Sequence, residues 1–297
     1  MTGIVVMALA LVVGRGQFHP SEVLHALTEI GPCATVAAAG LVMIQILLLA
    51  TRLWAVFPGA PRPSWPRVAY GFCVGQLLNN VIRRSGDVAK VLLVASPASR
   101  PGPGRAETAG VVVFDKVVDL TVLSVAFAWA GRGTAIPASG TWSTLAIVAV
   151  LGAVMGAALV LRKQSAIVAR VVAGMRVARD PRRLAAVAAM AMASWSAEIV
   201  ALHVLASMLG FDLGVADAVR CLVLLNLGVA IPLSAANLGT FEVSLAFGLH
   251  AAGLSLDEGL AIGAAYHVIQ LLAIVLCASS LALVRRSWST AFEPEVS

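Results

Sequence analysis

The sequence predicts an all-α protein, a polytopic membrane helical bundle with about six full spans and two oppositely oriented re-entrant helical hairpins. The first observation is composition: of 297 residues, 60% are hydrophobic and 12% are charged, and the mean hydropathy is +0.92. Soluble domains are about half apolar and about a quarter charged. The second is that apolar residues gather in long runs without the alternation of barrel strands. The third is that basic residues fall mainly on one side of these runs. We therefore treat residues 1–297 as a single integral membrane domain.

The apolar runs differ in length, and the length separates spans from hairpins. A spanning helix needs about 20 apolar residues. The run 1–13 is short, and with no basic residue before it we interpret it as a retained helix, not a signal peptide. Three other short runs are broken by polar residues, glycine or proline, so we expect them to enter the bilayer and return. The predicted spans are 1–13, 33–50, 109–130, 142–161, 184–209 and 260–284, and the predicted hairpins are 68–95 and 219–253.

The basic residues predict the topology. If 68–95 returns to the side it entered from, nearly all of the 21 lysines and arginines lie on one side, in 52–105, in 162–183 and after residue 284. Arg15 and Arg132 are alone in the opposite loops. The positive-inside rule then places both termini in the cytoplasm of a multi-pass protein of the cell membrane. The net charge of +6 follows from this topology and indicates no nucleic-acid partner.

The predicted order of elements contains a symmetry. Residues 33–130 form a first repeat of span, hairpin and span, and 184–284 form a second repeat with the inverted orientation. Inverted repeats with broken helices are the architecture of secondary transporters, whose substrate site lies between the repeats. Between them, 162–183 is basic with apolar residues at helical spacing, which predicts an interfacial segment on the cytoplasmic leaflet. A solvated loop is the alternative.

Polar residues cluster at the end of the short run in the first hairpin. At helical spacing, Asn80 shares a face with Arg84, and Arg83 shares a face with Asp87. Guanidinium groups in such a place suit a phosphate head group. A cytoplasmic loop with a stop-transfer arginine pair is the alternative interpretation.

The span 109–130 contains Asp115, Lys116 and Asp119. A charge at the centre of a bilayer costs roughly 2.5–3.5 kcal/mol on insertion scales, so these groups must pair or face water. Lys116 and Asp119 are spaced to pair within the helix, which leaves a carboxylate for Arg83 or Arg84. A structural ion network and direct contact with a ligand remain equal alternatives.

The second hairpin is broken between Pro232 and Gly239, which leaves free backbone groups at membrane depth. Its polar residues Ser234, Asn237 and Thr240 are candidate head-group contacts. Glu242 lies in the first turn of the returning helix, where it is placed to cap that helix or to meet a cation.

Further intramembrane polar residues complete the predicted ion-pair network with Glu242. Glu198 must be paired or protonated, and His267 is more simply a helix–helix hydrogen-bond partner than a metal ligand. The four cysteines lie in apolar stretches without a CxxC pair. The sequence therefore predicts no metal, no cofactor and no catalytic residue.

Three ordered motifs resemble the lysylphosphatidylglycerol synthase transmembrane, or flippase-like, family. The first runs from Gly71 to Lys90, the second is Asp115-Lys116 with Asp119, and the third runs from Pro232 to Glu242 and continues at Tyr266-His267. The resemblance covers roughly 33–285. In this chain Asp-Lys replaces the family's commoner Glu-Arg, which keeps the charge and loses the bidentate fork.

The resemblance implies lipid translocation, as in the flippase module of the multiple peptide resistance factor, here without the soluble synthase domain. The expected function is a non-enzymatic flippase for an anionic or aminoacylated phospholipid, or for a polyprenyl-phosphate-linked lipid. Membrane lipids are the expected partners, with a homo-oligomer or a biosynthetic enzyme as further candidates. Two alternatives are a membrane-embedded lipid-phosphate transferase and a non-catalytic partner of a cell-envelope biosynthetic complex.

Overall fold

The computed structural model describes residues 28, 31–59, 61–81, 85–97, 101–130, 165–230, 237 and 239–291. All regular structure within these ranges is helical, which confirms the predicted all-α class. The predicted spans 1–13 and 142–161 lie outside the described residues. The elements are α3 (Pro32–Val56), α4 (Trp65–Val81), α5 (Ser85–Val94), α6 (Arg105–Ala130), α8 (Ala166–Gly174), η1 (Arg176–Arg179), α9 (Pro181–Met208), α10 (Val215–Ala230), α11 (Thr240–Ala251) and α12 (Leu256–Ala291).

Within the described part of the chain, three helices are long and apolar enough to cross a bilayer, namely Pro32–Val56, Pro181–Met208 and Leu256–Val284. They correspond to the predicted spans 33–50, 184–209 and 260–284. The membrane class is therefore confirmed. Helix α6 has 26 residues and contains the predicted span 109–130, but charged residues interrupt its apolar sequence.

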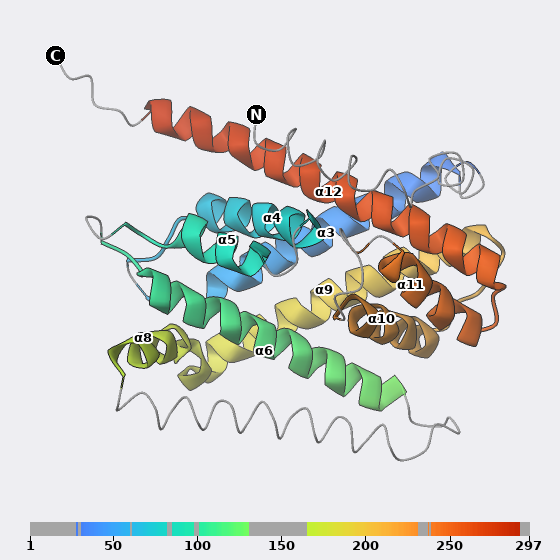
Figure 1. Ribbon diagram of the computed structural model, residues 1–297, viewed down its shortest axis with the longest axis horizontal. Helices are drawn as coiled ribbons and strands as arrows, with labels where there is room; N and C mark the ends of the chain where they lie inside the picture. The colour runs from blue at the N-terminus through green and yellow to red at the C-terminus, as the bar shows by residue number, and fades with distance from the viewer. Residues whose placement is uncertain are drawn as a thin grey trace.

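Two pairs of shorter helices lie where the sequence predicts hairpins. At about 1.5 Å per residue, the 17 residues of α4 reach about 26 Å and the 10 residues of α5 about 15 Å. Helices α10 and α11 have 16 and 12 residues. All four are shorter than a hydrocarbon core of about 30 Å. In Figure 1, α4 lies beside α5 and α10 lies beside α11, and each pair starts and finishes at one end of the bundle.

Glycine allows the paired helices to touch. A Cβ on Gly86 of α5 would lie 1.9 Å from the Gly75 carbonyl oxygen of α4, so only glycine fits there. A Cβ on Gly263 of α12 would lie 3.0 Å from the Glu242 Cα of α11. Small residues at such crossings are typical of membrane bundles, where close van der Waals packing holds helices together.

Eight of the described helices form two halves, α3–α6 and α9–α12, which meet where α3 packs against α9. The last helix of each half packs against the first hairpin helix of the other half, α12 on α4 and α6 on α10. Likewise α12 packs on α3, and α6 packs on α9. Within each half, consecutive helices pack on each other, and the first helix packs on the last. Figure 1 shows α12 crossing both α4 and α11 along the length of the molecule.

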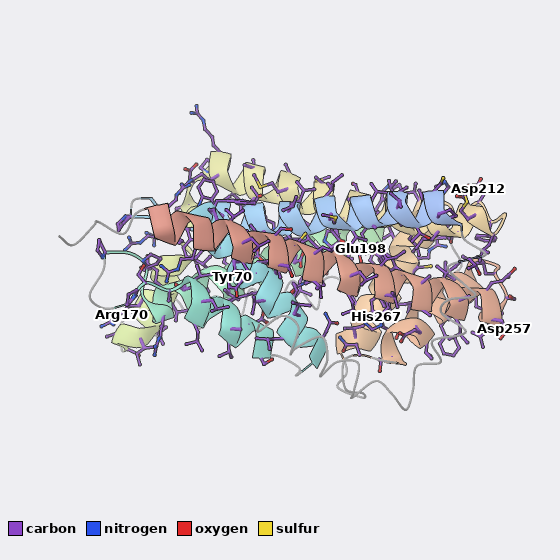
Figure 2. The ribbon with its side chains drawn as sticks, turned by 90° about the horizontal axis from the view of Figure 1, so that it is seen from above. Tyr70, Arg170, Glu198, Asp212, Asp257 and His267 are labelled. Atoms are coloured by element: carbon purple, nitrogen blue, oxygen red, sulfur yellow. The ribbon has the colours of Figure 1, made fainter. Side chains whose placement is uncertain are left out.

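The two ends of the bundle differ in charge. Figure 2 shows Arg170 of α8 at one end, with Asp212 and Asp257 at the other. Within the predicted interfacial segment 162–183, α8 is held against α6, where a Cβ on Gly110 would lie 1.9 Å from the Val171 carbonyl oxygen. Helix α9 then begins at Pro181, capped by the Asp180 carboxylate, which accepts hydrogen bonds from the next two backbone amides of the helix.

Candidate functional site

The most deeply buried ion pair of the described bundle is formed by Arg52 of α3, whose exposed fraction is 1%. Its Nε and Nη2 donate to the two carboxylate oxygens of Asp115 at 2.7 and 3.1 Å. Its Nη1 donates to Asp119 Oδ1 at 2.8 Å. Asp115 and Asp119 lie one turn apart on α6, so one guanidinium neutralises both.

Sequence reasoning assigned a different role to Arg52. It counted Arg52 only among the basic residues of 52–105 that set the topology and gave it no partner, whereas in the structure the side chain is buried. Asp119 pairs with this arginine across two helices. Arg83 and Arg84, the other predicted partners, lie outside the described residues, as does Ser234. The missed signal was spacing: Arg52 lies two turns after Gln45, on one face of a helix that continues past residue 50.

A second cation is buried in the first hairpin, where Lys90 of α5 is 2% exposed. Its Nζ donates to Asp87 Oδ1 at 3.1 Å and to Gln76 Oε1 at 3.2 Å, and lies 4.8 Å from the centre of the Phe72 ring. Lys116 of α6 also acts electrostatically on Asp87 and repels Lys90. The sequence motif contained Lys90, but its burial between α4 and α5 was not predicted.

Two amide side chains lie near the end of α4, and one of them joins α4 to α5. Asn79 Oδ1 accepts a hydrogen bond from the Gly86 backbone N–H at 2.9 Å. Asn80 Nδ2 donates to the Gln76 carbonyl oxygen at 3.0 Å. The predicted ligand contact Asn80 therefore lies at the tip, at the same end of the hairpin as Asp87.

In the second hairpin, Glu242 joins α11 to α12. Its Oε2 accepts the Gly239 backbone N–H at 2.7 Å, and its Oε1 lies 2.7 Å from His267 Nδ1. The His267 ring stacks on Phe241 with 4.3 Å between ring centres. Glu242 therefore caps the start of α11 with one carboxylate oxygen and contacts a histidine of α12 with the other. Thr240 is the first residue of α11, and Asn237 lies before it with a left-handed φ of 58°.

Glu198 of α9 is 6% exposed and lies where three helices meet. Gln45 Nε2 of α3 donates to its Oε2 at 2.6 Å, and Gln270 Nε2 of α12 lies 3.5 Å from its Oε1. The buried Tyr266 side chain lies beside the same carboxylate. Figure 2 shows Glu198 and His267 between the two ends of the molecule.

The interaction between hairpin and last helix occurs twice. Asp87 is the third residue of α5 and acts on Lys116, the twelfth residue of α6. Glu242 is the third residue of α11 and meets His267, the twelfth residue of α12. An acidic residue at the start of the returning helix thus faces a basic residue of the last helix in both halves.

The interaction between first and last helix also occurs twice. In each half, one buried ionisable side chain of the first helix faces the eleventh and fifteenth residues of the last helix. These residues are Arg52 with Asp115 and Asp119 in the first half, and Glu198 with Tyr266 and Gln270 in the second. The two last helices therefore use the same two positions to meet a buried ionisable side chain of the first helix, although the residue types differ.

Among the described residues, no group of three histidine, cysteine, aspartate or glutamate side chains is placed to hold a metal ion. The arrangement instead joins polar side chains from α3, α5, α6, α9, α11 and α12 in a network within the apolar bundle. These polar contacts hold neighbouring helices of the bundle together.

An all-helical bundle with span-length apolar helices and ion pairs buried among them defines a polytopic integral membrane protein. Residues 1–278 match the family model described as lysylphosphatidylglycerol synthase TM region, and the chain belongs to this family. The family agrees with the resemblance carried by the sequence motifs. Neither the comparison with curated proteins nor that with solved structures finds a match.

Proposed function

We propose that this chain is a lipid flippase of the cell membrane. Its substrate would be an anionic or aminoacylated phospholipid or a polyprenyl-phosphate-linked lipid, moved without chemical change. The observation that carries the proposal is the paired packing of α3–α6 and α9–α12, in which each main contact of one half has a counterpart in the other. Two equivalent halves that rock against each other are the basis of alternating access in secondary transporters.

The repeats 33–130 and 184–284 would then be inverted, with α4–α5 and α10–α11 as re-entrant hairpins. Their short lengths support this, as does the recurrence of an acidic residue at the start of α5 and α11 that interacts electrostatically or by a hydrogen bond with a basic residue of the following helix. The basic end of the bundle, marked by Arg170, would face the cytoplasm together with both termini. The first hairpin would enter from that side and the second from outside.

The head group would bind at the tip of the first hairpin. Lys90 pairs with Asp87, and Lys116 of α6 acts electrostatically on the same carboxylate, so the region beside the tip is rich in cations. Arg83 and Arg84 follow in the chain directly after α4 and add two guanidinium groups. Arginine offers parallel N–H donors to phosphate oxygens, which suits a phosphate diester. Ser234, Asn237 and Thr240 would face the same lipid from the second hairpin.

The test uses the purified chain in phosphatidylcholine vesicles that carry a fluorescent phosphatidylglycerol, with dithionite bleaching of the outer leaflet. The wild type is expected to expose the inner pool to dithionite, and the double variant Arg83→Ala/Arg84→Ala to lose this activity. The matched control is Arg176→Gln, which removes an exposed arginine from the basic end.

Two results would contradict the proposal. Full lipid movement by a well-folded double variant would exclude the arginine pair from head-group binding. Absence of movement by the wild type, with polyprenyl phosphate tested as a second lipid, would favour a partner role in a biosynthetic complex. A new lipid product in the same vesicles would indicate a transferase.

A further inference from the structure

The environment of Glu198 differs from that of the other buried acids. Its hydrogen-bonding neighbours are the neutral amides of Gln45 and Gln270, and the buried Tyr266 side chain lies beside it. Among the residues that the structure describes, no lysine, arginine or histidine lies within salt-bridge distance of it. A carboxylate with this burial and these partners is costly to keep ionised, and a protonated carboxyl group suits it better.

The charges on the surrounding helices are already matched to one another. Three cations from α3, α5 and α6 face three carboxylates from α5 and α6, and Glu242 of α11 faces His267 of α12. On α10, Arg220 pairs with Asp217 at 2.7 Å and donates to the Ala130 carbonyl oxygen. The cations are Arg52, Lys90 and Lys116, and the carboxylates are Asp87, Asp115 and Asp119.

The charged group that acts on Glu198 does not favour its ionised form. Asp119 of α6 acts electrostatically on Glu198, and two like charges repel. The arginines of η1, which also packs on α9, are exposed at the basic end of the bundle. An anionic Glu198 would thus be the unmatched charge of the described network.

The position of Glu198 ties its protonation to movement of the two halves. The hydrogen bond from Gln45 crosses the contact between α3 and α9, where the halves meet, whereas Gln270 belongs to the same half as Glu198. If the halves rock, the 2.6 Å bond from Gln45 must lengthen or break while the contact with α12 is kept. The proton affinity of the carboxylate then changes with conformation, as linkage requires.

We infer that Glu198 is a proton-binding site that couples lipid movement to a proton gradient across the membrane. In one arrangement of the halves it holds a proton among α3, α9 and α12. In the other it releases that proton to water, so that one proton crosses with each cycle. This inference rests on the proposed function, since it assigns that function its driving force.

The transport arm of the test uses proteoliposomes with fluorescent phosphatidylglycerol, an imposed pH difference, and the membrane potential held at zero with potassium and valinomycin. One pH unit of gradient should shift the steady-state leaflet distribution of the lipid by up to about tenfold for one coupled proton. Glu198→Gln keeps the shape and the hydrogen bonds of the side chain and should abolish this shift. Asp257→Asn, an exposed acid at the start of α12, is the matched control and should respond like the wild type.

The binding arm needs no lipid transport. The infrared spectrum of the protein should contain a carbonyl band of a buried protonated carboxylic acid, which Glu198→Gln removes and Asp257→Asn keeps. Lipid movement by the wild type that ignores the gradient would overturn the coupling and leave the flippase proposal standing. A wild type without lipid movement would overturn the flippase proposal, and an absent carbonyl band would overturn proton binding by Glu198.

Discussion

Arg52 of α3 and Asp115 of α6 form a bidentate ion pair in which both side chains are buried, with N–O distances of 2.7 and 3.1 Å. The pair joins the first and last helix of one half of the bundle. In the other half, Glu198 and Gln270 join α9 to α12 at the corresponding place. The same structural position therefore holds a charged pair in one half and a carboxyl–amide contact in the other.

Loss of Arg52 should destabilise the protein strongly. Arg52→Gln leaves the buried Asp115 and the half-buried Asp119 without a counter-charge, and removal of one partner of a buried pair costs about 3–5 kcal/mol. Thermal unfolding in detergent should show a large fall in the melting temperature, whereas Arg176→Gln should behave like the wild type. A double-mutant cycle of Arg52→Gln with Asp115→Asn should give a coupling energy of about 0.5–3 kcal/mol. Additive effects would mean that the pair does not form in the membrane.

Gly86→Ala should disrupt the first hairpin. The new methyl group would lie 1.9 Å from the Gly75 carbonyl oxygen, so α4 and α5 must separate, at about 1–3 kcal/mol or more. Gly40→Ala is the matched control, because no atom of another residue lies within 4 Å of its added Cβ. That control should be neutral or stabilising by up to about 1 kcal/mol, since alanine favours a helix. Equal stability of the two variants in detergent would contradict the close packing of the hairpin.

Glu242→Gln should destabilise the protein less than Glu242→Ala. Glu242→Gln keeps an oxygen for the Gly239 N–H or for His267, whereas Glu242→Ala leaves both without this partner. Each buried polar group left unsatisfied costs about 1–3 kcal/mol. The free energy of unfolding should therefore fall in the order wild type, Gln variant, Ala variant. An alanine variant as stable as the wild type would show that Glu242 neither caps α11 nor supports His267.

Labelling of single cysteines should distinguish the two ends of the bundle. The background is a variant in which the exposed Cys33 is replaced by alanine, since the other three cysteines are buried. In intact cells, a membrane-impermeant maleimide should label Asp212→Cys and should label Arg170→Cys only after permeabilisation. Both positions are exposed in the structure. Labelling of both positions in intact cells would contradict opposite sides for the two ends.

The sequence was informative where the physical cause was local or compositional. The membrane class follows from hydropathy, because 20 apolar residues without charge have no other stable environment. The short lengths of α4, α5, α10 and α11 and their broken tips were visible as interrupted apolar runs. The family was recognisable because its motifs combine polar residues and glycine at places where the bilayer normally forbids them.

The partners of the buried charges were decided by tertiary structure. Lys116 was predicted to pair with Asp119, yet α3 brings Arg52 to that carboxylate from 67 residues away. Helical spacing gives the partners available within one helix, whereas the partner actually used depends on which faces of two helices meet. The hydrogen bond between Gln45 and Glu198, 153 residues apart, has the same origin.

The sequence by itself thus determined the membrane environment, the helical class and the presence of charges that require partners. The physical reason is that hydrophobic transfer and backbone hydrogen bonding act on each segment separately. Only the tertiary structure decided that the carboxylates of α6 meet Arg52, that Glu242 meets His267 and that Glu198 meets neutral amides. These contacts depend on the crossing of distant helices, and close packing at glycines such as Gly86 and Gly263 sets where the helices cross.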